Sequence, residues 1–155
     1  MPKVSSQHVV DAPVEDVWES WADFGGIAKF HPGIKGSHSI SGSPASGLGA
    51  ERQCDLTANG KQYVRERVTK SVPMQEQVID IYEGTVPLKS ATARLRLAPI
   101  GSDKTKVMLE MEFKPGMGPI GWLMSPMMKM KFKSTVEALL KSNGEYVTKG
   151  VQIAR

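Results

Sequence analysis

The stretch "MSPMMKMKFKSTVEALLKSNG" (residues 124–144) carries two competing patterns. From Met128 to Lys133 apolar and basic residues alternate, which is typical of a strand with one apolar face. On a helical wheel of 100° per residue, most apolar positions instead share one arc: Met124, Met128, Phe132, Thr135, Val136 and Leu139. The opposite arc holds Lys129, Lys133, Glu137 and Lys141. Because the alternation stops after Lys133 while the helical pattern continues to Leu139, we predict a helix that ends at Gly144.

Three residues of this helix leave alternatives open. Pro126 either occupies the first turn behind a Ser125 cap or lies inside a longer helix that starts near Gly118. Met130 falls on the charged side, where it would be a single exposed apolar residue. Lys131 falls at the edge of the apolar arc, where it would either extend along the rim to solvent or point toward a cavity mouth.

Six segments before this helix alternate with a period of two residues, which predicts strands. They are "IKGSHSI", "AERQCDLT", "KQYVRERVTKSV", "EQVIDIYEG", "SATARLRLAP" and "KTKVMLEMEF". Turn residues separate them, and Asn59-Gly60 predicts a two-residue hairpin. In the last two segments an apolar face opposes a charged face, which predicts an antiparallel sheet with one side in solvent. The predicted helix would cover the other side.

The N-terminal part of the chain predicts one strand followed by two short helices. "KVSSQHVV" alternates, with Val4, His8 and Val10 on one face. "DAP" follows, and two acids in the next turn open a helix with an aromatic face. "GGIAKFHPG" predicts a second short helix that stops at Pro32.

Composition predicts a single domain over residues 1–155 and excludes several classes of protein. The chain has 155 residues, 40% of them hydrophobic, and a net charge of +4, far from the basic stripe of a nucleic-acid-binding protein. No run approaches the ~20 apolar residues of a membrane span, and "MPKVSSQHVV" lacks the apolar core of a signal peptide. The single cysteine, Cys54, excludes an internal disulfide and fits a reducing compartment, so we expect a cytoplasmic location.

The order of these elements resembles a known superfamily. A strand, an "APxxxVW" helix, a short helix, six antiparallel strands and a long C-terminal helix are similar to the START-like superfamily, also called SRPBCC or the birch-pollen-allergen fold. The matching stretches are "DAPVEDVWESWADFGGIAKFHPGIKGS", "GLGAERQCDLTANGKQYVRERV", "GTVPLKSATARLRLAP" and "VMLEMEFKP". Within the superfamily the chain looks most like the bacterial polyketide cyclase/dehydrase group, and more distantly like the plant abscisic-acid receptors.

The resemblance implies an α+β helix-grip fold. A curved seven-stranded antiparallel sheet would wrap around the long C-terminal helix, with two short helices between strands 1 and 2. A deep, mostly apolar cavity would lie between sheet and helix. We expect the residues that line it to be His8, Val10, Ile79, Ile81, Leu88, Leu95, Leu109, Met111, Trp122, Met128 and Phe132. Because methionine is flexible and polarizable, the Met-rich helix either forms an adaptable binding surface or fills a core.

The resemblance also implies a polar end to this cavity. In the resembling receptors, a lysine after the short helices and the glutamate of an "ER" pair lie in the ligand cavity, and the matching positions are Lys35 and Glu66. Alternation places Glu66 on the apolar face with Val64 and Val68, where a carboxylate is costly unless it is paired. Lys35 and Glu66 would offer a cation and an acceptor to a ligand; the alternatives are a surface salt bridge and no contact. "TANG" and "GTVPLKS" would be gate- and latch-like loops, or two ordinary hairpins.

Three functions follow as hypotheses. The first is a monomeric or dimeric carrier that binds a lipophilic small molecule, such as a lipid or polyketide. The second is a cyclase/dehydrase-type enzyme using the same cavity, in which the available acids and bases are Glu66, Lys35, His8 and Tyr82. The third is a membrane- or partner-docking module, whose amphipathic surface comprises Trp122, Leu123, Met127 and Met130. Because no HExxH, P-loop or dinucleotide fingerprint is present, we expect neither a metal nor a cofactor.

Overall fold

The computed structural model describes residues 3–86, 88–116 and 118–153, and the side chains of residues 120–122, 124 and 125 lie outside this description. Two short helices, α1 and the 3₁₀ helix η1, separate the first two strands, as predicted. The elements are β1 (Lys3–Val10), α1 (Val14–Ala22), η1 (Phe24–Lys29), β2 (Gly36–Ser39), β3 (Glu51–Asp55), β4 (Tyr63–Val72), β5 (Glu76–Gly84), β6 (Leu88–Ile100), β7 (Lys104–Pro115) and α2 (Gly118–Lys149).

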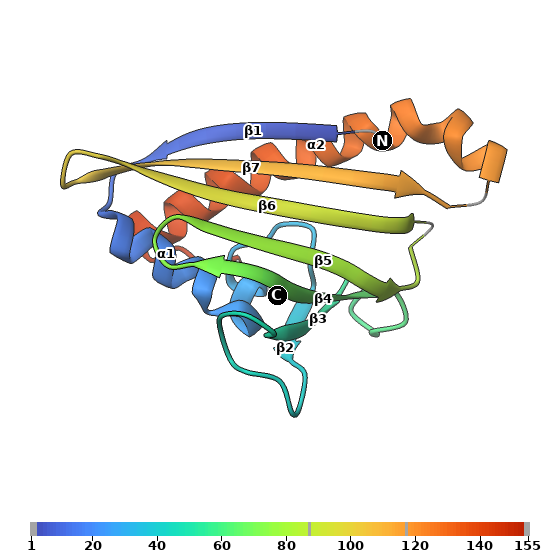
Figure 1. Ribbon diagram of the computed structural model, residues 1–155, viewed down its shortest axis with the longest axis horizontal. Helices are drawn as coiled ribbons and strands as arrows, with labels where there is room; N and C mark the ends of the chain where they lie inside the picture. Colours follow the sequence, from blue (N-terminus) through green and yellow to red (C-terminus); the bar gives the residue numbers. More distant parts are fainter. Residues whose placement is uncertain (1–2, 87, 117, 154–155) are drawn as a thin grey trace.

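The strands form one seven-stranded antiparallel sheet in the order β1-β7-β6-β5-β4-β3-β2. Successive strands from β2 to β7 are neighbours, whereas β1 returns to pair with β7 from Lys3 opposite Glu112 to Val10 opposite Thr105. Figure 1 shows the curved sheet in front and α2 crossing behind β1 and β7 toward α1. The predicted α+β helix-grip fold is therefore confirmed.

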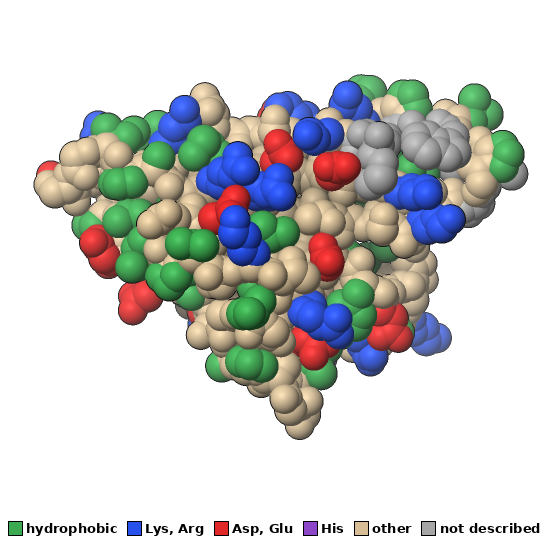
Figure 2. Space-filling model, in the orientation of Figure 1, with side chains coloured by type: hydrophobic (Ala, Val, Ile, Leu, Met, Phe, Trp, Pro, Cys, Tyr) green, Lys and Arg blue, Asp and Glu red, His purple; other side chains and the backbone are tan. Residues whose placement is uncertain are grey.

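The two faces of the sheet differ in polarity because side chains alternate along each strand. On β6, Ala91, Leu95 and Leu97 point inward and are buried, while Arg96 points to solvent. Arg96 reaches Glu76 of β5 on the outer face, with 3.0 Å between Nε and Oε2. Charged side chains of both signs lie over this face in Figure 2. The predicted sheet with one wet side is confirmed.

Helix α2 packs its C-terminal half against the inner face of the sheet. Val136, Leu139 and Leu140 are at most 6% exposed, as the wheel predicted for the first two. The ring of Phe132 meets that of Phe113 on β7 edge to face, with centroids 4.7 Å apart. The helix prediction for residues 124–144 is thus confirmed, and the helix is longer than this stretch because it begins at Gly118 and contains Pro126.

The predicted helix end at Gly144 is wrong. The helix continues to Lys149, and Gly150, with a φ of +70°, follows it. Gly144 is buried where α2 crosses β1, and a Cβ atom there would lie 3.2 Å from Nε2 of His8. Glycine at this position allows close contact between helix and strand instead of ending the helix.

The predicted two-residue hairpin at Asn59-Gly60 is also wrong. The connection between β3 and β4 spans residues 56–62. The Asn59 carbonyl oxygen Oδ1 accepts hydrogen bonds from the Thr57 hydroxyl, at 2.7 Å, and from the Lys61 N–H, at 3.0 Å. These local bonds stabilise a wider turn, in which Gly60 has a φ of +71°.

Candidate functional site

A buried ion pair lies on the inner face of the sheet. Glu66 of β4 sits between buried Val64 and Val68 and is 9% exposed, as alternation predicted. Arg52 of β3 is its cross-strand neighbour, and the Arg52 Nε donates to Oε1 of Glu66 at 2.7 Å. The Cys54 thiol donates to the same oxygen at 3.2 Å. We call these two charged residues the Arg52–Glu66 pair.

Neighbouring groups keep Glu66 ionised and hold the Arg52 guanidinium in place. Burial by itself raises the pKa of Glu66. The charge of the Arg52 guanidinium and its hydrogen bond lower this pKa, as do the Cys54 hydrogen bond and the charge of His31. Together they outweigh burial, so the pKa of Glu66 lies below its usual value. The Arg52 guanidinium lies 3.8 Å from the centroid of the Phe24 ring, and its Nη1 donates to the Phe24 carbonyl at 3.1 Å. Glu66 is therefore held ionised inside the protein.

Arg52 is a residue that the sequence reasoning missed. Lys35 was the cation weighed as a partner for Glu66, but the Lys35 side chain is exposed and the ion pair to Glu66 comes from Arg52. The signal was present, because Arg52 alternates with the small or apolar residues Ala50 and Cys54, both fully buried. A role for Lys35 in ligand binding stays a prediction.

The inner face is sealed at one end and less covered at the other. Near α1, buried Leu97, Val107 and Leu140 close the core. At the opposite end, where β6 begins and β7 ends (Figure 1), several inward-facing apolar side chains are only half-buried, although Ala91 and Phe113 are fully buried there. The half-buried side chains are Ile81, Val86, Leu88, Met111, Met128 and Phe132. The predicted ligand residues Ile79, Leu95 and Leu109 are buried in the core, His8 is half-buried against Gly144, and the Trp122 side chain lies outside the described residues.

Two hollows are found in the described part of the chain. One of about 250 Å³ lies at the less covered end, where half-buried Ile81, Val86 and Leu88 line it together with exposed residues of the same connection: Tyr82, Glu83, Gly84, Lys89 and Ser90. A larger one of about 480 Å³ is lined mainly by outer-face residues of β1, β6 and β7, among them the charged Arg94, Arg96 and Glu110. We take the smaller hollow as the candidate ligand site because Ile81 is the cross-strand neighbour of Glu66.

The family of the protein follows from its sequence. Residues 1–147 match the family described as polyketide cyclase / dehydrase and lipid transport. The chain belongs to this family. No curated protein matches the chain in sequence.

Solved structures of several other proteins share the fold of this family member. A START superfamily protein from Mycobacterium smegmatis has 20% identity and a TM-score of 0.78, covering 96% of this chain and 99% of its own. A protein from Thermus thermophilus has 19% identity and a TM-score of 0.76, with coverage of 96% and 99%. Truncated norcoclaurine synthase from Thalictrum flavum has 13% identity and a TM-score of 0.69, with coverage of 95% and 93%. Family and fold together suggest a protein that binds hydrophobic ligands.

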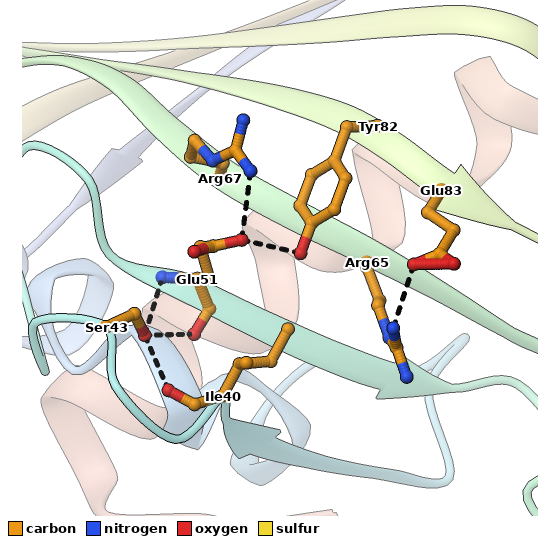
Figure 3. Close-up of polar contacts among 7 residues, drawn as sticks. All are labelled: Ile40, Ser43, Glu51, Arg65, Arg67, Tyr82 and Glu83. Carbon is orange, nitrogen blue, oxygen red and sulfur yellow. Dashed lines mark hydrogen bonds and ion pairs between the residues drawn. The ribbon is translucent and has the colours of Figure 1, made fainter.

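Tyr82, one of the candidate acids and bases, borders the hollow beside Ile81, but its hydroxyl lies on the outer face of the sheet. Figure 3 shows its hydroxyl pointing to Glu51 on the outer face, where it donates to Oε1 at 2.6 Å. Arg67 contacts the same oxygen at 3.1 Å. The Tyr82 hydroxyl is therefore directed away from the Arg52–Glu66 pair.

We expect Tyr82→Phe to remove the highest step from the alkaline absorbance titration of the tyrosines at 295 nm. Burial, the hydrogen bond to Glu51 and the charge of Glu51 raise the pKa of Tyr82 to about 12. The folded protein therefore keeps this phenol protonated above pH 10, and its ionisation appears only near pH 12. A titration of the variant that keeps this last step would show that Tyr82 does not carry it.

The described residues contain no group of three or more His, Cys, Asp and Glu side chains able to hold a metal ion. Within the same residues, no helix combines the length and hydropathy needed to cross a membrane. The chemistry available at the candidate site is therefore an ionised pair beside an apolar, partly covered surface.

Proposed function

We propose that this protein binds a lipophilic small molecule between the inner face of the sheet and the first half of α2, as a carrier or sequestering protein. The observation that supports this most directly is the set of half-buried inward side chains, among them Ile81, Met111 and Phe132. Side chains that face the core of a domain this size are normally sealed from water, as Leu97, Val107 and Leu140 are near α1. A lipophilic ligand would cover this apolar surface and gain its hydrophobic free energy.

The Arg52–Glu66 pair would orient the polar end of the ligand. Both described hydrogen bonds to the Glu66 carboxylate fall on Oε1, from Arg52 and Cys54. A ligand hydroxyl entering past Ile81 would meet the remaining oxygen, Oε2. Because the carboxylate is ionised and already desolvated, it would accept a strong hydrogen bond. The preferred ligand therefore combines an apolar body with a hydroxyl or a similar donor.

Ligand binding would require the site to open. Pockets for small molecules usually measure roughly 300–1,000 Å³, and the hollow beside Ile81 measures about 250 Å³. The β5–β6 connection borders this hollow, and the flexible side chains of Met111 and Met128 lie on the same half-buried surface. Movement of these parts would enlarge the hollow, in the way that the latch-like role expected for "GTVPLKS" requires.

We also place the protein in the cytoplasm, since its single cysteine is free and buried.

We expect Met111→Trp to weaken binding of a fluorescent fatty acid, such as cis-parinaric acid, by roughly tenfold or more. The indole would occupy the space between sheet and helix, and overpacking of this kind costs about 1–3 kcal/mol. The matched control is Glu112→Trp, which places the same ring on the outer face one residue away. Equal affinity in both variants, with native circular dichroism, would rule out this site.

A second candidate function is an enzyme of the cyclase/dehydrase type that uses the same site. The observation that favours it is the ionised, buried carboxylate of Glu66, which could accept a proton from a bound polyketide. Turnover of an aromatic polyketide by purified protein would exclude a pure carrier. If Glu66 is the base, Glu66→Gln should abolish turnover and leave fatty-acid binding within a few-fold of the wild type; unchanged turnover would exclude Glu66 from this role.

A further inference from the structure

The first half of α2 presents an apolar stripe to solvent. Leu123, Met127 and Met130 are spaced i, i+4 and i+7 and therefore share one face of the helix. They are 82%, 68% and 76% exposed. Phe132, which packs on Phe113, projects from the opposite side. We call Leu123, Met127 and Met130 the α2 stripe.

Basic residues border the α2 stripe. Lys131 lies on one flank and Lys129 and Lys133 on the other, by their angles on the helix, and all three are exposed. The sequence from residue 113 to residue 136 contains no Asp or Glu. The first acid beyond it is Glu137, whose carboxylate lies 3.7 Å from the Lys133 ammonium. The Lys133 ammonium also donates to the Ser5 carbonyl of β1, so the positive charge beside the stripe comes mainly from Lys129 and Lys131.

We propose that the α2 stripe docks on an anionic lipid membrane. Leucine and methionine side chains on one face would enter the boundary between headgroups and acyl chains, and the flanking lysines would contact the anionic headgroups. A free phosphate ion would explain the lysines but not the apolar stripe. Exposed apolar residues elsewhere, such as Leu48 and Ile100, lack this pairing of a helical stripe with flanking lysines.

The position of the stripe agrees with this role. In Figure 1 the start of α2 lies at the end of the molecule where the β5–β6 connection lies, and Figure 2 shows hydrophobic side chains along that edge. Docking there would bring the hollow beside Ile81 close to the lipid. The docking inference stands on the surface alone and does not depend on the proposed ligand.

The test is flotation of the purified protein with large unilamellar vesicles. We expect binding to vesicles with 30% phosphatidylserine in phosphatidylcholine at 50 mM NaCl, and at least tenfold weaker binding to phosphatidylcholine alone or at 500 mM NaCl. Lys129→Gln/Lys131→Gln should weaken binding roughly tenfold, as should Leu123→Ser/Met127→Ser. The matched controls, Lys61→Gln and Leu48→Ser, change exposed residues outside α2 and should bind as the wild type does.

Three results would overturn the proposal. They are absence of binding to the anionic vesicles, equal binding by the α2 and control variants, and a dimer in analytical ultracentrifugation that Leu123→Ser/Met127→Ser abolishes without vesicle binding. The last would assign the stripe to self-association. None of these results bears on fatty-acid binding, so the ligand proposal is tested separately.

A label provides an independent readout. Cys54 is fully buried and burial raises the pKa of its thiol, so an introduced cysteine would react selectively with an NBD dye. The dye on Met127→Cys should shift its emission to the blue on anionic vesicles, and the dye on Leu48→Cys should not. An unshifted spectrum at residue 127 on vesicles that bind the protein would place the contact elsewhere and overturn the proposal.

Discussion

Replacing Arg52 by methionine is expected to lower the free energy of unfolding by about 3–5 kcal/mol at neutral pH. Arg52 is 4% exposed and holds the buried carboxylate of Glu66 through a 2.7 Å hydrogen bond. Methionine would fill much of the volume but would leave Glu66 as an unpaired buried charge. Urea unfolding monitored by circular dichroism measures the change.

The pH dependence of this variant should be opposite to that of the wild type. In the wild type the pKa of Glu66 is lowered, so the stability from this group is present above about pH 4.3, the unfolded value, and is lost as pH falls through the folded pKa. Without Arg52, burial dominates and raises the pKa of Glu66. The variant is then most stable below about pH 4.3 and loses stability as pH rises from there. The difference between the two proteins should therefore shrink as pH falls and be smallest below the folded pKa of Glu66.

Two further variants separate the buried pair from ordinary surface charge. Arg65→Met removes an exposed ion pair with Glu83, and its cost should stay within about 1 kcal/mol. Arg52→Met/Glu66→Leu removes both buried charges and should recover most of the lost stability. If Arg52→Met costs no more than Arg65→Met at pH 7, the pair is not buried as described.

Replacing Phe113 by alanine is expected to cost about 3–5 kcal/mol of unfolding free energy. Phe113 is fully buried on β7 and packs edge to face on Phe132 of α2. Truncation would leave a cavity at the contact that joins the sheet to the helix. Ile100→Ala, at a residue that is 47% exposed, is the control and should change stability by less than about 0.5 kcal/mol.

A double-mutant cycle with Phe132→Ala tests the ring contact itself. The coupling between the two positions should be about 0.5–1.5 kcal/mol, the usual value for an aromatic pair beyond its buried area. Strict additivity of the two substitutions would contradict the packing of α2 on β7 at this point.

The fold could be predicted from sequence because its periodicities are clear. Apart from β2, whose sequence GSHS has no apolar residue, the strands and α2 coincide with stretches whose apolar residues repeat at two or at 3.6 positions. Features set by tertiary contact could not be predicted in this way. Glycine is a common helix end, and only the close passage of His8 shows that Gly144 belongs inside α2.

The candidate site was predicted only in part. Glu66 was placed inside because alternation with Val64 and Val68 is a local property. The partner of Glu66 depends on which strand lies next to β4 and on the register of that pairing. The local sequence pattern contains neither. Lys35 was named as the cation because the resemblance placed its position in the cavity, and Arg52 was not considered. Leu123, Met127 and Met130 were named from the sequence, with Trp122, as an amphipathic surface, and all three are exposed in the structure.

The pairing of β1 with β7 has a consequence for how the chain folds. Val10 and Thr105 are paired although almost a hundred residues separate them, whereas every other strand pair joins successive strands. At a synthesis rate of roughly 5–20 residues per second, β1 would leave the ribosome several seconds before its partner exists. The sheet can grow strand by strand from β2, but β1 can join it only after β7 has been made. Nascent chains would therefore expose an unpaired N-terminal strand, and the slowest step of refolding should be the docking of β1 together with α2.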